Sequence, residues 1–218
     1  MRHPNQQRQS DRRAEILDAA ERCFARAGFH RASMQDICAE AAMSPGNLYR
    51  YFPSKEALIV GICERNRADA VDSFNHVNDA PNVFEALAGL AQYHLVDRTD
   101  DEVSICAEIM AESRRHPDIA QLYQTIENDI RERIAAMLTR AAERGEIRSD
   151  VDIDAVAGLL LAIGDGMSWR RSVDPKFSAE VALPLVLKMV HGLLAPAKNG
   201  AVAANSGDKP ADANGIKS

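Results

Sequence analysis

Long apolar runs are missing from this sequence, and their absence argues against a membrane-spanning protein. No apolar stretch approaches the roughly 18 to 20 residues that a membrane-spanning helix needs. The polar beginning, MRHPNQQRQSDRR, lacks the apolar segment of a secretory leader. We therefore expect a cytoplasmic protein without a membrane partner.

Cysteine is scarce, and its positions exclude the usual cysteine chemistry. Cys23, Cys38, Cys63 and Cys106 form no C-x-x-C pair, and no histidine pair has metal-ligand spacing. Glycine-rich phosphate loops and nucleophile motifs are also absent from the sequence. We expect reduced cysteines, no metal site, no cofactor and no enzymatic activity.

Strand signals are missing as well. No segment alternates apolar and polar residues, aromatic residues make up only 5%, and Ala, Leu, Ile, Glu and Arg dominate. The 218 residues suffice for one mid-sized domain or for a small module joined to a larger one. The expected fold class is all-α.

Caps and 3.6-residue periodicity divide the first part of the chain into four helices. They are expected at 11–27, 33–41 and 44–51, with a fourth that begins after Ser54. Ser33 and Asp36 resemble a capping box, and Pro45 suits the first position of a helix that Ser44 caps. Pro53 disfavours helical geometry at the preceding residue and so ends that short helix.

The rest of the chain has the pattern of a second module of longer helices. They are expected at 81–96, 101–115, 117–144, 150–173 and 178–194. The expected organisation is a flexible arm at 1–9, a small helical domain at 10–60, a larger helical domain at 61–195 and a disordered tail at 196–218.

Charge is distributed unevenly between the two modules. The chain carries a formal net charge of −6, but residues 1–66 hold ten basic and eight acidic side chains, which leaves −8 for the remainder. We expect phosphates to bind the slightly basic amino-terminal module and to be repelled by the acidic body.

Two short helices joined by a tight turn have the layout of a helix-turn-helix module. On the segment 44–51, Leu48 faces inward, whereas Gly46, Asn47 and Arg50 lie on the opposite face. Asn47 suits adenine and Arg50 suits guanine or a phosphate, while Gly46 permits close backbone approach. Other polar groups near helix starts favour phosphate contacts. The complete candidate DNA-binding set is Ser33, Gln35, Ser44, Pro45, Gly46, Asn47, Tyr49, Arg50, Tyr51 and Lys55. The competing interpretation is a plain three-helix corner with solvated charges.

The segment SMQDICAEAAMSPGNLYRYFPSKEAL, residues 33–58, resembles the signature of the TetR family of bacterial transcriptional regulators. The resemblance extends back to Ile16, and the body is similar to a broad subgroup that contains regulators of betaine synthesis and multidrug efflux. Twelve positions match in register: Ser33, Ile37, Ala41, Ser44, Gly46, Leu48, Tyr49, Tyr51, Phe52, Lys55, Glu56 and Leu58.

Two positions depart from the family pattern. Ala42 stands where the family usually has the turn glycine, which would cost on the order of 1 kcal/mol if that position needs a positive φ. Asn47 occupies a position that is often Thr or Ala, so the operator sequence of relatives does not carry over.

The resemblance implies a homodimeric repressor that a small hydrophobic or amphipathic effector releases from double-stranded DNA. The last two helices would pair across a twofold axis, which matches a palindromic operator with half-sites spaced by about 34 Å or a multiple. The apolar segments 156–167 and 181–194 are compatible with such an interface, and burial within one chain is the alternative.

An effector pocket in the body would need an apolar lining with a few polar groups. The candidates are Phe84, Leu87, Tyr93, His94, Ile109, Met110, Tyr123, Asp165, Met167 and Trp169, of which Asp165 is the polar anchor. Ordinary core packing is the competing interpretation for each.

Two other functions fit the same sequence. A transcriptional activator of the same fold differs only in where its operator lies. A helical enzyme or small-molecule carrier that does not bind DNA is the alternative of a different class, and no catalytic motif supports it.

Overall fold

The computed structural model describes residues 4–196, and over this range the chain is all-α, as predicted. The amino-terminal helices are α1 (Pro4–Ala27), α2 (Met34–Glu40), α3 (Pro45–Tyr51) and α4 (Lys55–His76). The later helices are α5 (Val83–Gln92), α6 (Asp100–Ser113), α7 (Pro117–Glu143), α8 (Ile153–Val173) and α9 (Ala179–Leu194). A π-helical turn, η1 (Tyr93–Asp97), continues α5 where the sequence predicted ordinary helix to residue 96.

The amino-terminal arm differs from the expectation. The helix α1 begins at Pro4, so most of the segment 1–9 that we expected to be flexible is helical. Proline suits the first turn of a helix, and the Gln and Arg residues that follow have good helix propensity. The predicted tail at 196–218 lies outside the described residues, apart from Pro196.

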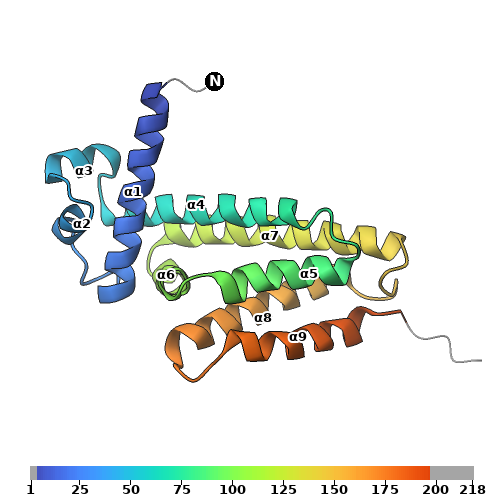
Figure 1. Cartoon of the computed structure of the whole chain (residues 1–218). Coiled ribbons are helices and arrows are strands. Elements are labelled where there is room, and N and C mark those ends of the chain that lie inside the picture. Colours follow the sequence, from blue (N-terminus) through green and yellow to red (C-terminus); the bar gives the residue numbers. More distant parts are fainter. Residues whose placement is uncertain (1–3, 197–218) are drawn as a thin grey trace, which may run out of the picture.

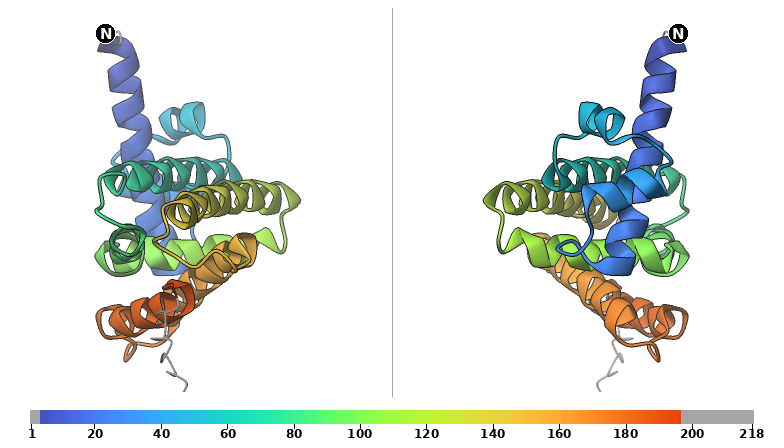
Figure 2. Two further views of the ribbon diagram at one scale, coloured as in Figure 1. Left: turned by 90° about the vertical axis from the view of Figure 1, so that its right-hand side faces the viewer. Right: turned by 90° about the vertical axis from the view of Figure 1, so that its left-hand side faces the viewer.

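The helices form a small amino-terminal group at one end of a larger body (Figure 1). The long helices α4 and α7 pack side by side, and α6 contacts α1, α7 and α8. Figure 2 shows α8 and α9 as the outer layer on the side of the body away from α3. Within residues 4–196, no helix combines the length and apolarity that crossing a bilayer requires.

Two main cores hold this arrangement together. The first includes Phe24, Leu48 and Phe52 of the amino-terminal group, and it also includes Ile105 of α6. The second lies among α5, α7, α8 and α9. Because α4 runs past residue 60 and the first core reaches α6, the amino-terminal helices pack directly onto the body.

Gly61 of α4 allows the closest approach in the first core. A Cβ added there would lie 2.9 Å from Phe52 Cε1 and 3.0 Å from Leu17 Cδ2. These distances are too short for a larger residue, so glycine is needed where α4 passes the end of α3.

Candidate DNA-binding surface and ligand cavity

The helix α2 starts with the predicted capping box. The Ser33 N–H donates to Asp36 Oδ2 at 2.9 Å, and the Asp36 N–H donates to Ser33 Oγ at 3.1 Å. The Ser33 hydroxyl also donates to Asp36 Oδ2 at 2.6 Å, and the hydrogen bonds from Ser33 lower the pKa of Asp36. The Ser33 side chain, which we expected on phosphate, is therefore already engaged in the cap.

The turn between α2 and α3 requires a left-handed residue. Ala42 has φ of 49° and is the one non-glycine residue with positive φ in the described part of the chain. The turn closes through hydrogen bonds from Ala42 N to Ala39 O at 3.2 Å and from Met43 N to Cys38 O at 3.0 Å. Alanine in this conformation costs about 1 to 2 kcal/mol, so the turn forms despite the missing glycine.

The limits of α3 agree with the sequence, but one capping contact does not. Pro45 is the first residue, and Phe52 leaves the helix with φ of −138° before Pro53. The Ser44 side chain makes no capping hydrogen bond, contrary to the prediction. The reason is that the Asn47 N–H donates to the backbone oxygen of Ser44 at 3.0 Å. The Ser44 hydroxyl remains exposed on the surface.

The outer face of α3 presents polar groups to solvent. Leu48 is fully buried, whereas Tyr49 and Arg50 are exposed and Asn47 is half-buried. Nothing lies within 4 Å of a Cβ added at Gly46, so the protein itself does not need glycine there. Five predicted contact residues form no side-chain hydrogen bond or ion pair with any residue in the range 4–196: Gln35, Ser44, Asn47, Tyr49 and Arg50.

Two predicted contact residues are partly engaged within the fold. Lys55 Nζ donates to Phe29 O at 2.7 Å and lies 4.6 Å from the centre of the Phe29 ring. Tyr51 is half-buried and packs against the first core. Lys55 thus stabilises the turn that follows α1, which the sequence did not reveal because the two residues are far apart in the chain.

Contacts that sequence reasoning missed join the amino-terminal group to α6. Glu108 Oε2 accepts a hydrogen bond from the Phe29 N–H at 2.9 Å. The nearly buried Glu112 carboxylate lies 2.9 Å from His30 Nε2, 3.3 Å from His116 Nε2 and 3.0 Å from an Arg115 nitrogen. These glutamates connect the end of α1 to the body.

The body contains a cavity of about 300 Å³ with a largely apolar lining. Side chains from α4, α5, η1 and α6 to α9 surround it. Most of the predicted ligand residues line it: Leu87, Tyr93, His94, Ile109, Met110, Tyr123, Asp165 and Trp169. This volume suits a small organic molecule.

Two predicted ligand residues lie elsewhere. Phe84 lies in the first turn of α5, where its ring centre lies 4.5 Å from that of His191, and it packs against the second core. Met167 is buried in a small cluster with Leu95 and Leu183. Helical spacing alone did not show how far the cavity extends along α5 or which face of α8 it meets.

His94 is neutral in the cavity wall. The Ser73 hydroxyl donates to Ala70 O at 2.6 Å and lies 2.9 Å from His94 Nε2. Because the Ser73 proton is already engaged, Nε2 carries the proton and donates to Ser73. Burial and the nearby Arg98 lower the pKa of His94 to about 4.

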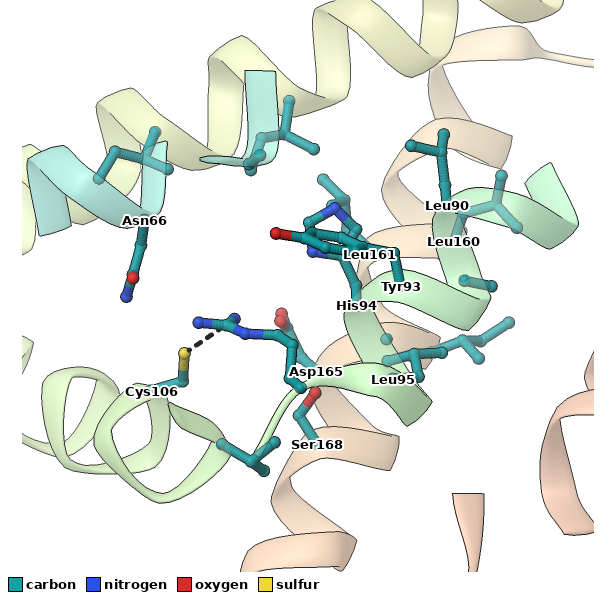
Figure 3. A pocket seen from close by; sticks show the side chains of 18 of the residues that line it. Asn66, Leu90, Tyr93, His94, Leu95, Cys106, Leu160, Leu161, Asp165 and Ser168 are labelled. Carbon is teal, nitrogen blue, oxygen red and sulfur yellow. Dashed lines mark hydrogen bonds between the residues drawn. The ribbon is translucent and has the colours of Figure 1, made fainter. Parts of the chain in front are cut away.

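Asp165 and Tyr123 are two further titratable groups with perturbed pKa values at the cavity. Burial, and next the charge of Glu127, raise the pKa of Asp165. Burial and the charge of Asp165 raise the pKa of Tyr123. Figure 3 shows Asp165 and Ser168 on one helix, with Tyr93 and His94 on the wall beside them.

Arg98 is a cavity residue that the sequence did not single out. It follows η1, and its Nη1 donates to Cys106 Sγ at 3.4 Å, which is the dashed line in Figure 3. The sequence carried no signal for it, because an arginine between two helices usually points into solvent.

The outward faces of α8 and α9 are apolar. Several large apolar side chains there are exposed, and Leu185 keeps 68% of its surface accessible. The exposed large hydrophobic residues of these two helices are Leu159, Trp169, Val173, Val181, Leu185, Met189 and Leu193. Such a patch on the outer layer is typical of a protein interface.

The structure combines a helix-turn-helix that has an exposed polar face, a helical body that contains a cavity, and an apolar outer layer. Together these features define a DNA-binding regulator that responds to a small molecule. Residues 16–62 match the family described as bacterial regulatory proteins, tetR family, and residues 87–195 match the BetI-type transcriptional repressor C-terminal family. The chain belongs to the TetR family of transcriptional regulators.

Individual relatives agree with this assignment. The HTH-type transcriptional regulator UidR of Escherichia coli is 33% identical over 159 residues, which are 71% of this chain and 79% of the relative. The structure of Salmonella enterica GusR is 35% identical with a TM-score of 0.73, and the match covers 84% of this chain and 95% of GusR. A regulator from Saccharomonospora viridis in complex with choline is 25% identical with a TM-score of 0.77, over 86% of this chain and 99% of that one.

Proposed function

We propose that this TetR-family regulator is a homodimeric repressor that leaves a palindromic operator when a small amphipathic or hydrophobic molecule fills its cavity. The observation that carries the proposal is that one chain combines an apolar cavity with an exposed polar face on α3, whose side chains have no partner among residues 4–196. The BetI-type repressor match supports repression, and the choline complex of a relative supports a small-molecule effector. Because its partner is operator DNA, we place its action in the cytoplasm and assign it binding rather than catalysis.

Sequence preference would come from α3 and affinity from its surroundings. Asn47 and Arg50 are in position to meet base edges, since both lie on the outer face of a helix that fits the major groove. Gln35, Ser44 and Tyr49 surround them with uncommitted polar groups for phosphates. Residues 10–60 would form the DNA-binding domain and residues 61–195 the effector and dimer domain.

The dimer would form through the apolar outer layer of α8 and α9. Regulators of this family act as dimers, and exposed side chains such as Val181, Leu185 and Met189 recur every four residues along α9. Their burial against a second copy would remove apolar surface from water, and twofold symmetry matches a palindromic operator.

Effector binding would reach the DNA-binding surface through α6. This helix lines the cavity with Cys106 and Met110 and holds the end of α1 with Glu108 and Glu112. An effector that prefers one position of α6 would shift the dimer toward a half-site spacing that does not fit the operator.

A gel-shift titration of fragments from the promoter of its own gene tests DNA binding. We expect Asn47→Ala to weaken binding more than tenfold, because the side chain would lose its base contact. Asn128→Ala, an exposed asparagine on α7, is the matched control and should bind as the parent does. Failure of the parent protein to shift any such fragment would overturn the proposed function.

The oligomeric state in solution tests the dimer. Leu185→Asp places a charge in the apolar layer and should give a monomer in light scattering, together with loss of operator binding. Gln124→Asp on the exposed surface of α7 is the control. A parent protein that remains monomeric at micromolar concentration while binding its operator would contradict this part.

A further inference from the structure

The chemical class of the effector follows from an arginine at the cavity that has no ion pair among residues 4–196. We infer that the effector carries a carboxylate, which the guanidinium of Arg98 binds, and this inference rests on the proposed function. It adds a chemical class and an anchoring residue to a cavity that by shape alone would accept many small molecules.

Arg98 has only a weak partner among residues 4–196. Its guanidinium makes one hydrogen bond among the described residues, to Cys106 Sγ at 3.4 Å, and no ion pair there. A thiol is a weak acceptor, and burial raises the pKa of Cys106, so this sulfur carries no negative charge. Most of the five donors of this half-buried guanidinium therefore have no partner among residues 4–196.

Three carboxylates that neighbour Arg98 in the sequence make contacts elsewhere. Glu102 Oε2 accepts hydrogen bonds from the Thr99 N–H at 2.7 Å and from the Thr99 hydroxyl at 2.9 Å. Asp97 accepts from the Gln92 amide at 2.8 Å. Asp100 Oδ1 forms an ion pair with Arg171 at 2.9 Å. None of these three forms an ion pair with Arg98, although the charge of Glu102 acts on it, so hydrogen-bond donors of Arg98 remain available to a ligand.

Asp165 is the competing anchor, and it would select a cation instead. Its carboxylate also lacks an ion pair among residues 4–196. An aspartate, however, can lose its charge by taking up a proton, and both burial and Glu127 raise the pKa of Asp165. Arginine has no neutral form in proteins. The arginine therefore has the stronger need for a charged ligand.

The cavity also has the polarity that an amphipathic carboxylate requires. In Figure 3, Asn66, Cys106, Asp165 and Ser168 lie toward one end, and the leucines of α5 and α8 lie toward the other. The carboxylate would face Arg98, and the apolar part of the effector would extend toward the leucine end. Hydroxyl groups near the carboxylate would find partners on Asp165 and Ser168.

Matched probes on the full-length dimer test this inference. Octanoate, octanamide and octyltrimethylammonium share a chain and differ only in head group, and 4-phenylbutyrate with its amide repeats the comparison with a ring. Calorimetric titration should show each carboxylate binding at least tenfold more tightly than its amide. Arg98→Gln should abolish that preference, since a charge-assisted pair contributes about tenfold to a hundredfold in affinity. Arg131→Gln, an exposed arginine on α7, should retain it.

Each other outcome overturns the inference. Preference for the ammonium probe would assign the anchor to Asp165. Equal binding of acid and amide, retention of the preference in Arg98→Gln, or no binding of any carboxylate would remove the role of Arg98. A fall in the melting temperature of ligand-free Arg98→Gln, with no change in probe binding, would make Arg98 a structural residue. Operator binding of the parent protein in gel shifts is measured in parallel, so failure of this inference is distinguishable from failure of the proposed function.

Discussion

The DNA-binding face and the effector cavity are built in opposite ways. The face is presented by one helix, α3, whose seven residues carry both the buried anchor Leu48 and the exposed polar groups. The cavity is assembled from side chains on six helices and the π-helical turn, and no single segment contains it. Binding surfaces of the first kind depend on local order, whereas those of the second kind depend on how distant segments pack.

Truncation of the anchor should affect the face much more than the cavity. Leu48→Ala removes a fully buried side chain from the first core, and we expect unfolding free energy to fall by about 2 to 5 kcal/mol. Operator binding should fall with it, because α3 loses its fixed orientation. Urea unfolding measures the loss of stability, and a gel shift measures the loss of operator binding. Gln124→Ala on the exposed surface of α7 is the control, and an equal loss there would show that position in the core is irrelevant.

The pH dependence of stability should report on the cavity instead. The pKa of His94 is about 4 in the folded protein, compared with about 6.5 in an unfolded chain. Between these values the unfolded chain binds a proton that the folded protein does not, so unfolding free energy falls as pH falls. We expect a loss of about 2 kcal/mol between about pH 7 and about pH 5.

The variant His94→Gln isolates this effect. Glutamine keeps a donor for Ser73 but has no proton to gain, so urea unfolding of the variant should depend less on pH than unfolding of the parent protein. Identical pH profiles for the two proteins would show that His94 does not titrate as the structure indicates.

Lys55 belongs to the predicted DNA-binding face, but its partner within the protein, Phe29, is distant in the sequence. Lys55→Met should lower unfolding free energy by about 1 to 2 kcal/mol, because it removes the hydrogen bond to Phe29 O and the contact with the Phe29 ring. Lys176→Met, an exposed lysine, is the control. We expect the salt dependence of operator binding to stay unchanged. If the slope of the logarithm of the binding constant against the logarithm of salt concentration becomes smaller by about one, Lys55 also neutralises a phosphate.

The smallest predicted effect concerns the turn before α3. Ala42→Gly should raise unfolding free energy by up to about 1 kcal/mol, because glycine adopts the positive φ without strain, although it adds entropy to the unfolded chain. Ala39→Gly within α2 should lower it by about 1 kcal/mol. Thermal unfolding measures both variants. A loss of stability in Ala42→Gly would mean that the turn holds alanine without strain.

Most of the fold and the outward face of α3 could be predicted from the sequence. The capping box at Ser33, the end of α3 before Pro53 and the burial of Leu48 are confirmed. All follow from contacts within a few residues. Sequence reasoning missed the helical start at Pro4, the π turn and the absence of a side-chain cap at Ser44, where several local structures compete closely in energy.

The residues that line the cavity could be predicted from the sequence only in part. Tyr93 and Asp165 line it as expected, but Phe84 faces His191, and Arg98 was not among the candidates. Which face of a helix meets a cavity depends on the relative rotation of packed helices, and no repeat in the sequence encodes that rotation.

The sequence by itself determined the helices, the turn and the outward polar face of α3, because caps, prolines and apolar periodicity act over one or two turns of chain. Only the tertiary structure decided which charges find partners. Lys55 donates to the Phe29 carbonyl oxygen, and the Glu112 carboxylate lies beside His30, Arg115 and His116. Among the described residues, Arg98 donates only to the Cys106 thiol. Pairing requires segments distant in sequence to come within about 3 Å, and that proximity arises only when the cores pack.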